Sequence, residues 1–438
     1  MYMYRKAMKD LVQWKKKSNR KPLIIRGARQ VGKTWLMKKF GELHYSNTVY
    51  INCENNSRIK KLFSSGFDIE SLIFGLRIES DSEITENKTL IILDEIQEAP
   101  QALTALKYFQ ENAPQYHIVS AGSLPGVSLH SGISFPVGKV DFLNLHPLNF
   151  IEFLTASGND ALVELIERKD FKLISTFKQK YIDWLKKYYF VGGMPEAVVD
   201  FLAQNNLSSV RTIQTNLLTA YEQDFSKHPS PFDILKIRML WNSLPSQLAR
   251  ENRKFLYGLI RSGARAREYE STIEWLKDSG LIHKVFRITK PGIPLTAYQD
   301  MKSFKIFMPD VGLLAAHSRL DSKTILEGNS IFEEFKGALT EQYVLQQLMA
   351  MNSITPFYWS AEKSTGEIDF IFQLEDTVVP LEVKAAENLQ SKSLRNFSRK
   401  YIHTQAFRTS LADYRKEDWV TNIPLYAINA LESWYADV

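Results

Sequence analysis

The chain has 438 residues, of which 44% are hydrophobic and 24% are charged, as in an ordinary globular protein of two or three domains. Cys53 is the only cysteine, which excludes an intramolecular disulfide and favours a reducing compartment. No apolar run reaches the roughly 18 residues of a membrane span, and the charged N-terminal stretch lacks a signal-peptide core. We therefore expect a cytoplasmic protein with no membrane partner. The net charge of +6 permits an anionic partner without proving one.

The first informative segment is a predicted strand at residues 23–25, followed by a glycine loop and an amphipathic helix. Residues 27–34, GARQVGKT, fit the pattern G-x-x-x-x-G-K-[ST]. The backbone amides of such a loop can surround a phosphate at the positive end of a helix. Lys33 would reach the β- and γ-phosphates, and the Thr34 hydroxyl would bind Mg²⁺. The sequence therefore predicts a site for ATP with Mg²⁺.

The second informative segment is KTLIILDEIQEAP, in which a buried parallel strand ends at Asp94 and Glu95. Ligands of open α/β sheets bind at this edge, so we expect Asp94 to serve the Mg²⁺ shell and Glu95 to polarise the attacking water. The alternative, an acidic helix cap, explains one carboxylate but not the pairing with a phosphate loop. A third strand, at residues 116–121, is followed by loop hydroxyls, and Ser120 and Ser123 could sense the γ-phosphate.

Four motifs together, GARQVGKT, LDEIQ, PLNFIEFL and VGGMPEAV, resemble the AAA-type ATPases of the archaeal ATPase branch of the STAND-related P-loop proteins. The resemblance implies that the lid motif Gly193-Met194-Pro195 lies close to the nucleotide, in place of the lid arginine of other AAA+ proteins. Many such ATPases carry a C-terminal domain related to the restriction-endonuclease fold. Where relatives often have Gly-Arg, this chain has Gly138-Lys139. Lys139 could contact phosphate or could simply be solvated.

The middle of the chain is basic and has the pattern of a winged helix. Helical runs are followed by two strand-like runs around Pro291-Gly292. This segment could contact the DNA backbone, or it could be an internal joint whose arginines are solvated or face the nucleotide. Mutation of Arg265 and Arg267 would distinguish these two interpretations. The basic residues, opposed only by Glu251, are Lys236, Arg238, Arg250, Arg253, Lys254, Arg261, Arg265 and Arg267.

Residues 366–385, GEIDFIFQLEDTVVPLEVKA, predict a β-hairpin with a turn at Glu375-Asp376. With a two-residue loop, Asp369 lies opposite Glu382, Lys384 points to the same side, and the other side is apolar. Opposed carboxylates repel one another unless a cation lies between them, so the pattern predicts a Mg²⁺ site. The alternative is a solvated hairpin face with a Lys–Glu pair, and a one-residue slip in register would remove the site.

At these residues the segment resembles the PD-(D/E)xK nucleases, which include Holliday-junction resolvases. In that family an Asp on one strand and an E-x-K on the next bind Mg²⁺ and cut phosphodiesters, assisted by a Glu on the preceding helix. The resemblance implies these roles for Asp369, Glu382 and Lys384, with Glu341 as the helix residue. A later helix places basic side chains where a nucleic-acid backbone could pass. These side chains are Lys392, Arg395, Arg399 and Lys400.

We expect an α/β protein with four parts: a P-loop NTPase core with a parallel sheet (1–150), a helical lid (151–228), a winged-helix segment (229–318) and a restriction-endonuclease-like domain (319–438). It would be a Mg-ATP-hydrolysing ATPase coupled to a nuclease-like domain acting on DNA. The alternative is a nucleotide-dependent switch that binds protein or nucleic acid without cutting. The expected partners are ATP and DNA, with DNA held by residues 236–267 and the C-terminal domain, and a homo-oligomer is possible.

The candidate site residues fall into three sets. Those expected to bind nucleotide are Gly27, Ala28, Arg29, Gln30, Val31, Gly32, Lys33, Thr34, Trp35 and Pro195. Those expected to act in catalysis are Lys33, Glu95, Asp369, Glu382 and Lys384. Those expected to bind metal are Thr34, Asp94, Glu341, Asp369 and Glu382.

Overall fold

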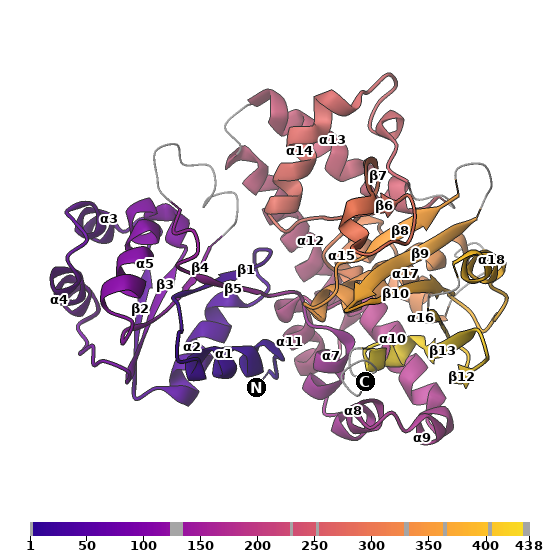
Figure 1. Ribbon diagram of the computed structural model, residues 1–438, viewed down its shortest axis with the longest axis horizontal. Helices are drawn as coiled ribbons and strands as arrows, with labels where there is room; N and C mark the ends of the chain where they lie inside the picture. Colours follow the sequence, from indigo (N-terminus) through magenta and orange to yellow (C-terminus); the bar gives the residue numbers. More distant parts are fainter. Residues whose placement is uncertain are drawn as a thin grey trace. The chain divides into compact units, whose positions relative to one another are not determined.

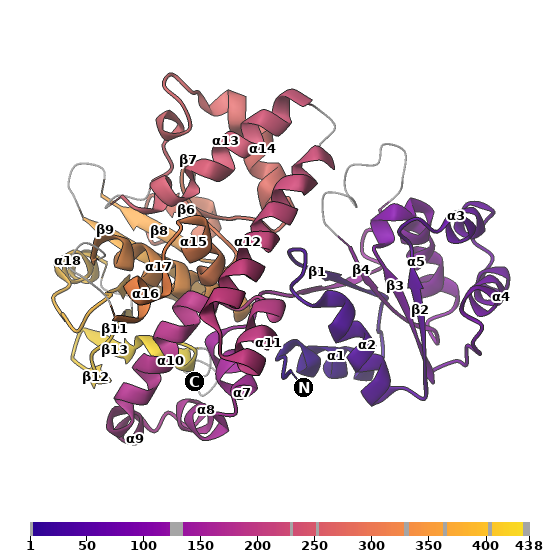
Figure 2. The same ribbon diagram turned by 180° about the vertical axis from the view of Figure 1, so that it is seen from behind.

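The computed structural model describes residues 3–122, 135–227, 231–250, 254–327, 333–361, 366–401 and 405–431. The chain forms two compact units, shown from opposite sides in Figures 1 and 2. The N-terminal unit comprises Met3–His146 and Asp278–Gly280, and the C-terminal unit comprises Pro147–Lys277 and Leu281–Val438. Each unit has a sheet of its own. Within the described residues, no helix is long and apolar enough to cross a membrane.

The N-terminal unit is built on a five-stranded parallel sheet in the order β2-β3-β4-β1-β5. The predicted strand at residues 23–25 lies within β1, and the run that ends at Asp94 is β3, so both are confirmed. The strands are β1 (Leu23–Arg26), β2 (Asn47–Asn52), β3 (Thr89–Asp94), β4 (His117–Ala121) and β5 (Asp141–Asn144). The helices are α1 (Ala7–Lys16), α2 (Lys33–His44), α3 (Ser57–Ser64), α4 (Ile69–Ser80) and α5 (Pro100–Asn112).

Both faces of this sheet are covered, which explains why its central strands are continuous apolar runs. All six residues of β3 are buried. Side chains of β2 and β3 form one core with α3, α4 and α5, while α1 and α2 lie together and α2 contacts β2, β3 and β4 (Figure 1). The parallel α/β architecture is that of a P-loop NTPase, as predicted from the sequence.

Helices make up the first part of the C-terminal unit. The first helix begins with a capping box, in which Asn149 and Glu152 bond reciprocally to each other's backbone N–H. The lid motif is held by the same unit, because the Gly193 N–H donates to the buried Asp310 carboxylate at 2.6 Å and Pro195 opens the next helix. The helices are α7 (Phe150–Ala156), α8 (Asp160–Glu167), α9 (Phe171–Thr176), α10 (Lys178–Val191), α11 (Pro195–Gln204) and α12 (Leu207–Asp224).

The rest of the C-terminal unit forms a mixed eight-stranded sheet in the order β12-β13-β11-β10-β9-β8-β6-β7. The strands are β6 (His283–Ile288), β7 (Gln299–Phe307), β8 (Phe357–Ser360), β9 (Glu367–Leu374), β10 (Thr377–Val383), β11 (Ala406–Ser410), β12 (Arg415–Lys416) and β13 (Val420–Pro424). The helices are α13 (Pro231–Leu248), α14 (Ala266–Asp278), α15 (Val311–His317), α16 (Ser322–Glu327), α17 (Glu333–Ala350) and α18 (Lys392–Lys400).

The predicted boundary at residues 318/319 does not coincide with a break in this sheet. Two helices, α13 and α14, are indeed followed by the hairpin β6–β7, but β6 also pairs in parallel with β8. The hairpin that we interpreted as a wing is therefore continuous with the C-terminal sheet. Parallel pairing joins segments far apart in the chain, so local sequence patterns do not reveal it.

The charged hairpin has the predicted register, since Leu374 pairs with Thr377 and Phe370 with Leu381 around the Glu375-Asp376 turn. Regular pairing ends there, one step before the expected Asp369–Glu382 pair. The prediction of one apolar and one charged face needs correction. On the face that was predicted to be charged, Ile371 and Val378 are buried in one cluster with Leu394 and Phe397 of α18.

Candidate functional site

The glycine loop has the backbone conformation that a phosphate cradle requires. Gly27 has φ +153°, and a Cβ there would lie 2.1 Å from the Leu145 carbonyl oxygen. Gly32, with φ +93°, begins α2 in a left-handed conformation that favours glycine. Gln30 also has a positive φ, of 63°. The loop therefore turns tightly onto the start of α2, where backbone N–H groups favour an anion.

Lys33 is held inside this loop. Its ammonium donates to the carbonyl oxygens of Gly27 at 2.9 Å and Ala28 at 2.8 Å, and the residue is 9% exposed. Burial lowers the pKa of Lys33 to about 8, although the charges of Glu95 and Asp94 oppose this shift. Both partners are neutral acceptors, so a phosphate would be a stronger one.

The predicted metal-binding pair is assembled at the end of β3. The Thr34 hydroxyl donates to the Asp94 carboxylate at 2.6 Å, which brings together the two oxygen donors expected to serve Mg²⁺. Tyr50 of β2 donates to the same carboxylate oxygen at 3.1 Å. Nothing in the sequence pattern indicated Tyr50, which reaches Asp94 because β2 and β3 are neighbours in the sheet.

Glu95 follows Asp94 in a left-handed turn, with φ 49°, and its carboxylate accepts a hydrogen bond from the Gln97 side chain. A Cβ at Gly122 would lie 2.5 Å from the Gln97 side-chain oxygen, so a larger residue there would displace Gln97. Gln97 lies within the LDEIQ motif, so its place in the resemblance was a signal of its role. It positions the carboxylate proposed to polarise water.

The other residues predicted for this site have mixed outcomes. The Ser120 hydroxyl is buried in the sheet and donates to the Leu23 carbonyl oxygen at 3.2 Å, which does not fit a phosphate sensor. Ser123 lies outside the described residues. Lys139 forms an ion pair with Glu111 at 2.9 Å, an arrangement that neither alternative predicted. Ala28 and Val31 are buried, and Arg29, Gln30 and Trp35 are at least partly exposed.

Arg5 is a residue that the sequence analysis missed. This buried side chain donates to the carbonyl oxygen of Val31 at 2.9 Å and to that of His146. It therefore ties the phosphate loop to the end of the unit.

In the C-terminal unit, Glu341 lies on α17 beside a lysine that the sequence analysis did not single out. Lys305 of β7 is completely buried, lies 3.8 Å from a Glu341 oxygen, and forms an ion pair with Glu367 of β9. Its ammonium also lies 4.9 Å from the centre of the Tyr358 ring. Glu341 is thus part of a Glu341–Lys305–Glu367 group.

The hairpin residues form a second group. Asp369 accepts a hydrogen bond from the Val383 N–H at 2.8 Å, so its carboxylate replaces a backbone acceptor where regular pairing has ended. Lys384 pairs with Glu382 at 2.7 Å. Burial, and then the Asp369 charge, raise the pKa of Glu382 to about 7, with Lys384 opposing the shift. The structure therefore brings Asp369, Glu382 and Lys384 together as predicted.

The carboxylates of these two groups do not form a metal-binding set. Among the residues that the structure describes, no three His, Cys, Asp or Glu side chains are arranged to hold a metal ion. Each group instead contains a lysine ammonium in contact with carboxylate oxygens. The Mg²⁺ site of Glu341, Asp369 and Glu382 stays a prediction.

The predicted basic surfaces differ from one another. In the 236–267 segment, Lys236 pairs with Asp233 and Arg261 with Glu268, whereas Arg265 and Arg267 are exposed. Arg253 lies outside the described residues. On α18 the buried face packs on the sheet, and the other face presents four exposed basic side chains. These are Lys392, Arg395, Arg399 and Lys400.

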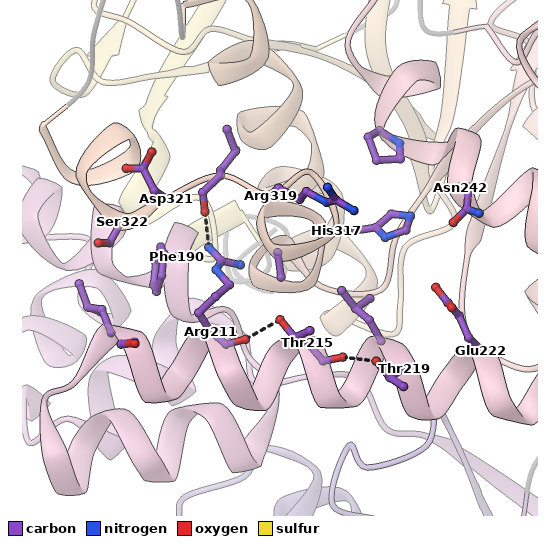
Figure 3. A pocket seen from close by; sticks show the side chains of 16 residues that line it. Phe190, Arg211, Thr215, Thr219, Glu222, Asn242, His317, Arg319, Asp321 and Ser322 are labelled. Atoms are coloured by element: carbon purple, nitrogen blue, oxygen red, sulfur yellow. Dashed lines mark hydrogen bonds between the residues drawn. The ribbon is translucent and has the colours of Figure 1, made fainter.

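A separate cavity of about 900 Å³ lies within the C-terminal unit, between α12, α13 and the segment from α15 to α16 (Figure 3). Pro245 lies inside α13, and because proline has no N–H the Trp241 carbonyl loses its usual helical donor. His317 fills this role, with its Nε2 3.0 Å from the Trp241 oxygen. On the opposite wall, the Arg211 guanidinium stacks 4.2 Å from the centre of the Phe190 ring.

Comparison with known proteins matches three segments of the chain to protein families. The fold and loop define a P-loop NTPase, and residues 19–154 match the family described as an AAA domain. Residues 182–324 and 336–428 match two families described as domains of unknown function, DUF8612 and DUF4143. An uncharacterized protein of Mycobacterium tuberculosis, and one of Mycobacterium bovis, are each 22% identical over 382 residues, which cover 85% of this chain and 73% of the relative.

Similar solved structures are more distant. A Walker-type ATPase of Pyrococcus abyssi aligns with a TM-score of 0.45 and 14% identity, over 72% of this chain and 96% of that one. The ORC1 protein of Aeropyrum pernix, solved in complex with DNA, aligns with a TM-score of 0.28 and 13% identity, over 73% of this chain and 93% of that one. Both TM-scores are below 0.5, so neither likeness assigns an activity.

Proposed function

We propose that the protein is a Mg-ATP-dependent ATPase whose C-terminal unit acts as a nucleotide-controlled binding module. The observation that carries this proposal is the convergence of Lys33, Thr34, Asp94 and Glu95 at one end of the parallel sheet. All four lie around one glycine loop whose backbone leaves no room for a Cβ at Gly27. The match of residues 19–154 to an AAA domain supports the same function.

Each residue of this site would have a separate role. Lys33 would leave the carbonyl oxygens of Gly27 and Ala28 and bind phosphate, where its charge offsets the charge of the transferred group. Thr34 and Asp94 would hold Mg²⁺, which supplies charge neutralisation when bound. Glu95, held by Gln97, would orient and polarise the attacking water. Pro195 remains a predicted contact of the nucleotide.

The test is phosphate release from ATP by the full-length chain with Mg²⁺, beside Lys33→Ala and a matched control. We expect Lys33→Ala to lower turnover by about 10²-fold or more, because it removes the charge that stabilises the transferred phosphoryl group. Lys61→Ala changes an exposed lysine of the same unit and should have no effect. Equal turnover in the wild type and Lys33→Ala would refute the proposed site.

For the C-terminal unit we propose binding of a nucleic-acid backbone by α18. Lys392, Arg395 and Arg399 recur at helical spacing on the exposed face, opposite the buried Leu394 and Phe397. Such a row of cations suits phosphates and carries no base specificity. The net charge of +6 agrees with an anionic partner.

Binding of a fluorescent DNA duplex at several salt concentrations tests this second function. Replacing Lys392, Arg395 and Arg399 with Gln should reduce the slope of log K against log salt by about 0.9 for each phosphate that the variant no longer neutralises. Arg265→Gln with Arg267→Gln is the parallel test of the 236–267 segment. An unchanged slope in the α18 variant would exclude this helix as the DNA-binding element.

Cutting of DNA is the competing function for this unit, and it has its own assay. Duplex, single-strand and four-way-junction DNA would be incubated with Mg²⁺ or Mn²⁺, with wild type and Asp369→Asn in parallel. Cleavage that disappears in Asp369→Asn would establish a nuclease. Binding without cleavage would support the switch.

A further inference from the structure

Lys305 is an unusual residue to find in the interior of the C-terminal sheet. The residue has no exposed surface, and the two nearest carboxylates come from different elements, Glu341 from α17 and Glu367 from β9. A lysine is rarely buried completely unless it is paired, because the loss of hydration is costly. The fold therefore places an ammonium where three separate segments meet.

The position of this ammonium conflicts with a bound divalent ion. Mg²⁺ lies about 2.1 Å from its oxygen ligands, so an ion bound by Glu341 and Glu367 would lie within a few ångström of the Lys305 charge. The repulsion between like charges at that distance is large in a buried site. One cation can therefore occupy the space between these carboxylates, and the chain already supplies it.

We propose that Lys305 is the resident counter-cation of Glu341 and Glu367 and excludes a divalent metal ion from the space between these two carboxylates. Glu341 thereby serves an internal ion pair, although its place in the sequence pattern matches a helix residue of a metal-dependent nuclease. This inference is independent of ATP hydrolysis in the N-terminal unit.

The experiment is a calorimetric titration of the full-length chain with Mn²⁺ in the absence of nucleotide, joined to thermal unfolding with and without Mn²⁺. The variants are Lys305→Gln, Lys305→Gln with Glu341→Gln, and Lys302→Gln as the control. Lys302 lies on the same strand but is exposed. We expect Lys305→Gln to gain one Mn²⁺ site and a saturating rise in its unfolding midpoint. Both gains should disappear when Glu341→Gln is added.

Two results would overturn the inference. The first is a Mn²⁺ site in the wild type that is lost in Glu341→Gln. This measurement needs only folded wild-type protein and a conservative variant, so it decides the matter even if Lys305→Gln does not fold. The second is a folded Lys305→Gln protein that gains no Mn²⁺ site.

Discussion

The two units each bury a lysine beside carboxylates, and the partners of the two lysines differ. In the N-terminal unit, Lys33 donates to two neutral carbonyl oxygens of its own loop. In the C-terminal unit, Lys305 already contacts two carboxylates. A phosphate can therefore improve the environment of Lys33, whereas Lys305 has its counter-charges within the fold. Similar residue types thus give a ligand site in one unit and an internal ion pair in the other.

This difference shows what a motif can and cannot indicate. Charged residues at motif spacing indicate a binding site when the fold does not neutralise all of their charge. A ligand of opposite charge can then neutralise the rest. The P-loop meets this condition, because Gly27 and Gly32 shape a cradle at a helix N-terminus. In the E-x-K segment, Lys384 pairs with Glu382 and Asp369 accepts a backbone N–H, so these side chains already have partners within the fold.

The largest expected effect is on turnover in the N-terminal unit. Glu95→Gln keeps the shape of the side chain and its contact with Gln97 but removes the charge that polarises water. We expect phosphate release to fall by about 10²–10³-fold while ATP affinity is unchanged. Release assays and calorimetric binding measure the two quantities. Glu98→Gln, at a nearby acid that pairs with Lys60, is the control, and a large drop in turnover there would contradict this assignment.

The next effect is on stability in the C-terminal unit. Lys305→Met leaves Glu341 and Glu367 without their shared cation, and breaking a buried ion pair typically costs about 3–5 kcal/mol. Lys384→Met should cost about 1 kcal/mol or less, because its side chain is 31% exposed. Urea unfolding measures both changes. Equal costs would mean that Lys305 is not specially placed.

The phosphate loop of the N-terminal unit could be predicted from sequence because its signals are local. The strand at residues 23–25, the glycine loop and the helix that follows are contiguous, and each has its own pattern of side chains. The hairpin register was predictable for the same reason, since the Glu375-Asp376 turn fixes it. Tyr50 was not, because its contact with Asp94 depends on which strands are neighbours.

The ion pairs of Lys305 in the C-terminal unit could not be predicted, because they depend on pairing between distant segments. Lys305 meets Glu341 and Glu367 only after β6 has paired in parallel with β8 and α17 has packed against the sheet. Its sequence context, KSFKIF, looks like an ordinary strand with an exposed lysine. The hairpin register predicted the grouping of Asp369, Glu382 and Lys384, but neither the register nor the resemblance to nucleases indicated the cation that lies beside Glu341.

A smaller effect concerns pH and follows from the neutral partners of Lys33. Its pKa is about 8 in the free protein, and a bound phosphate favours the charged form. Binding then takes up a proton above pH 8, so ATP affinity should fall by about 10-fold per pH unit beyond that point. The free energy of unfolding depends on pH in the opposite direction. The unfolded chain holds this proton up to the ordinary value, so between the two pKa values the free energy of unfolding rises with pH.

Calorimetric titrations of ATP between pH 7 and pH 9.5 measure this dependence. Lys33→Arg is the control, because a guanidinium stays charged over the whole range and its weaker binding should not vary with pH. Wild-type affinity that stays constant up to pH 9.5 would show that Lys33 does not deprotonate in the free site. The contrast with Lys305 would then rest on geometry alone.

The last effect is expected where a polar pair carries no net charge, at the wall of the cavity in Figure 3. Burial lowers the pKa of His317, so the ring is neutral at pH 7 and donates from Nε2 to the Trp241 carbonyl, which Pro245 leaves without a helical donor. His317→Leu should cost about 1–3 kcal/mol, because it leaves a buried acceptor without a hydrogen bond.

Pro245→Ala restores the missing N–H, so it should stabilise the His317→Leu protein more than the wild type. A double-mutant cycle by urea unfolding measures this difference. Additive effects would mean that His317 does not replace the missing helical bond, and that buried pairing in this unit matters only where charge is involved.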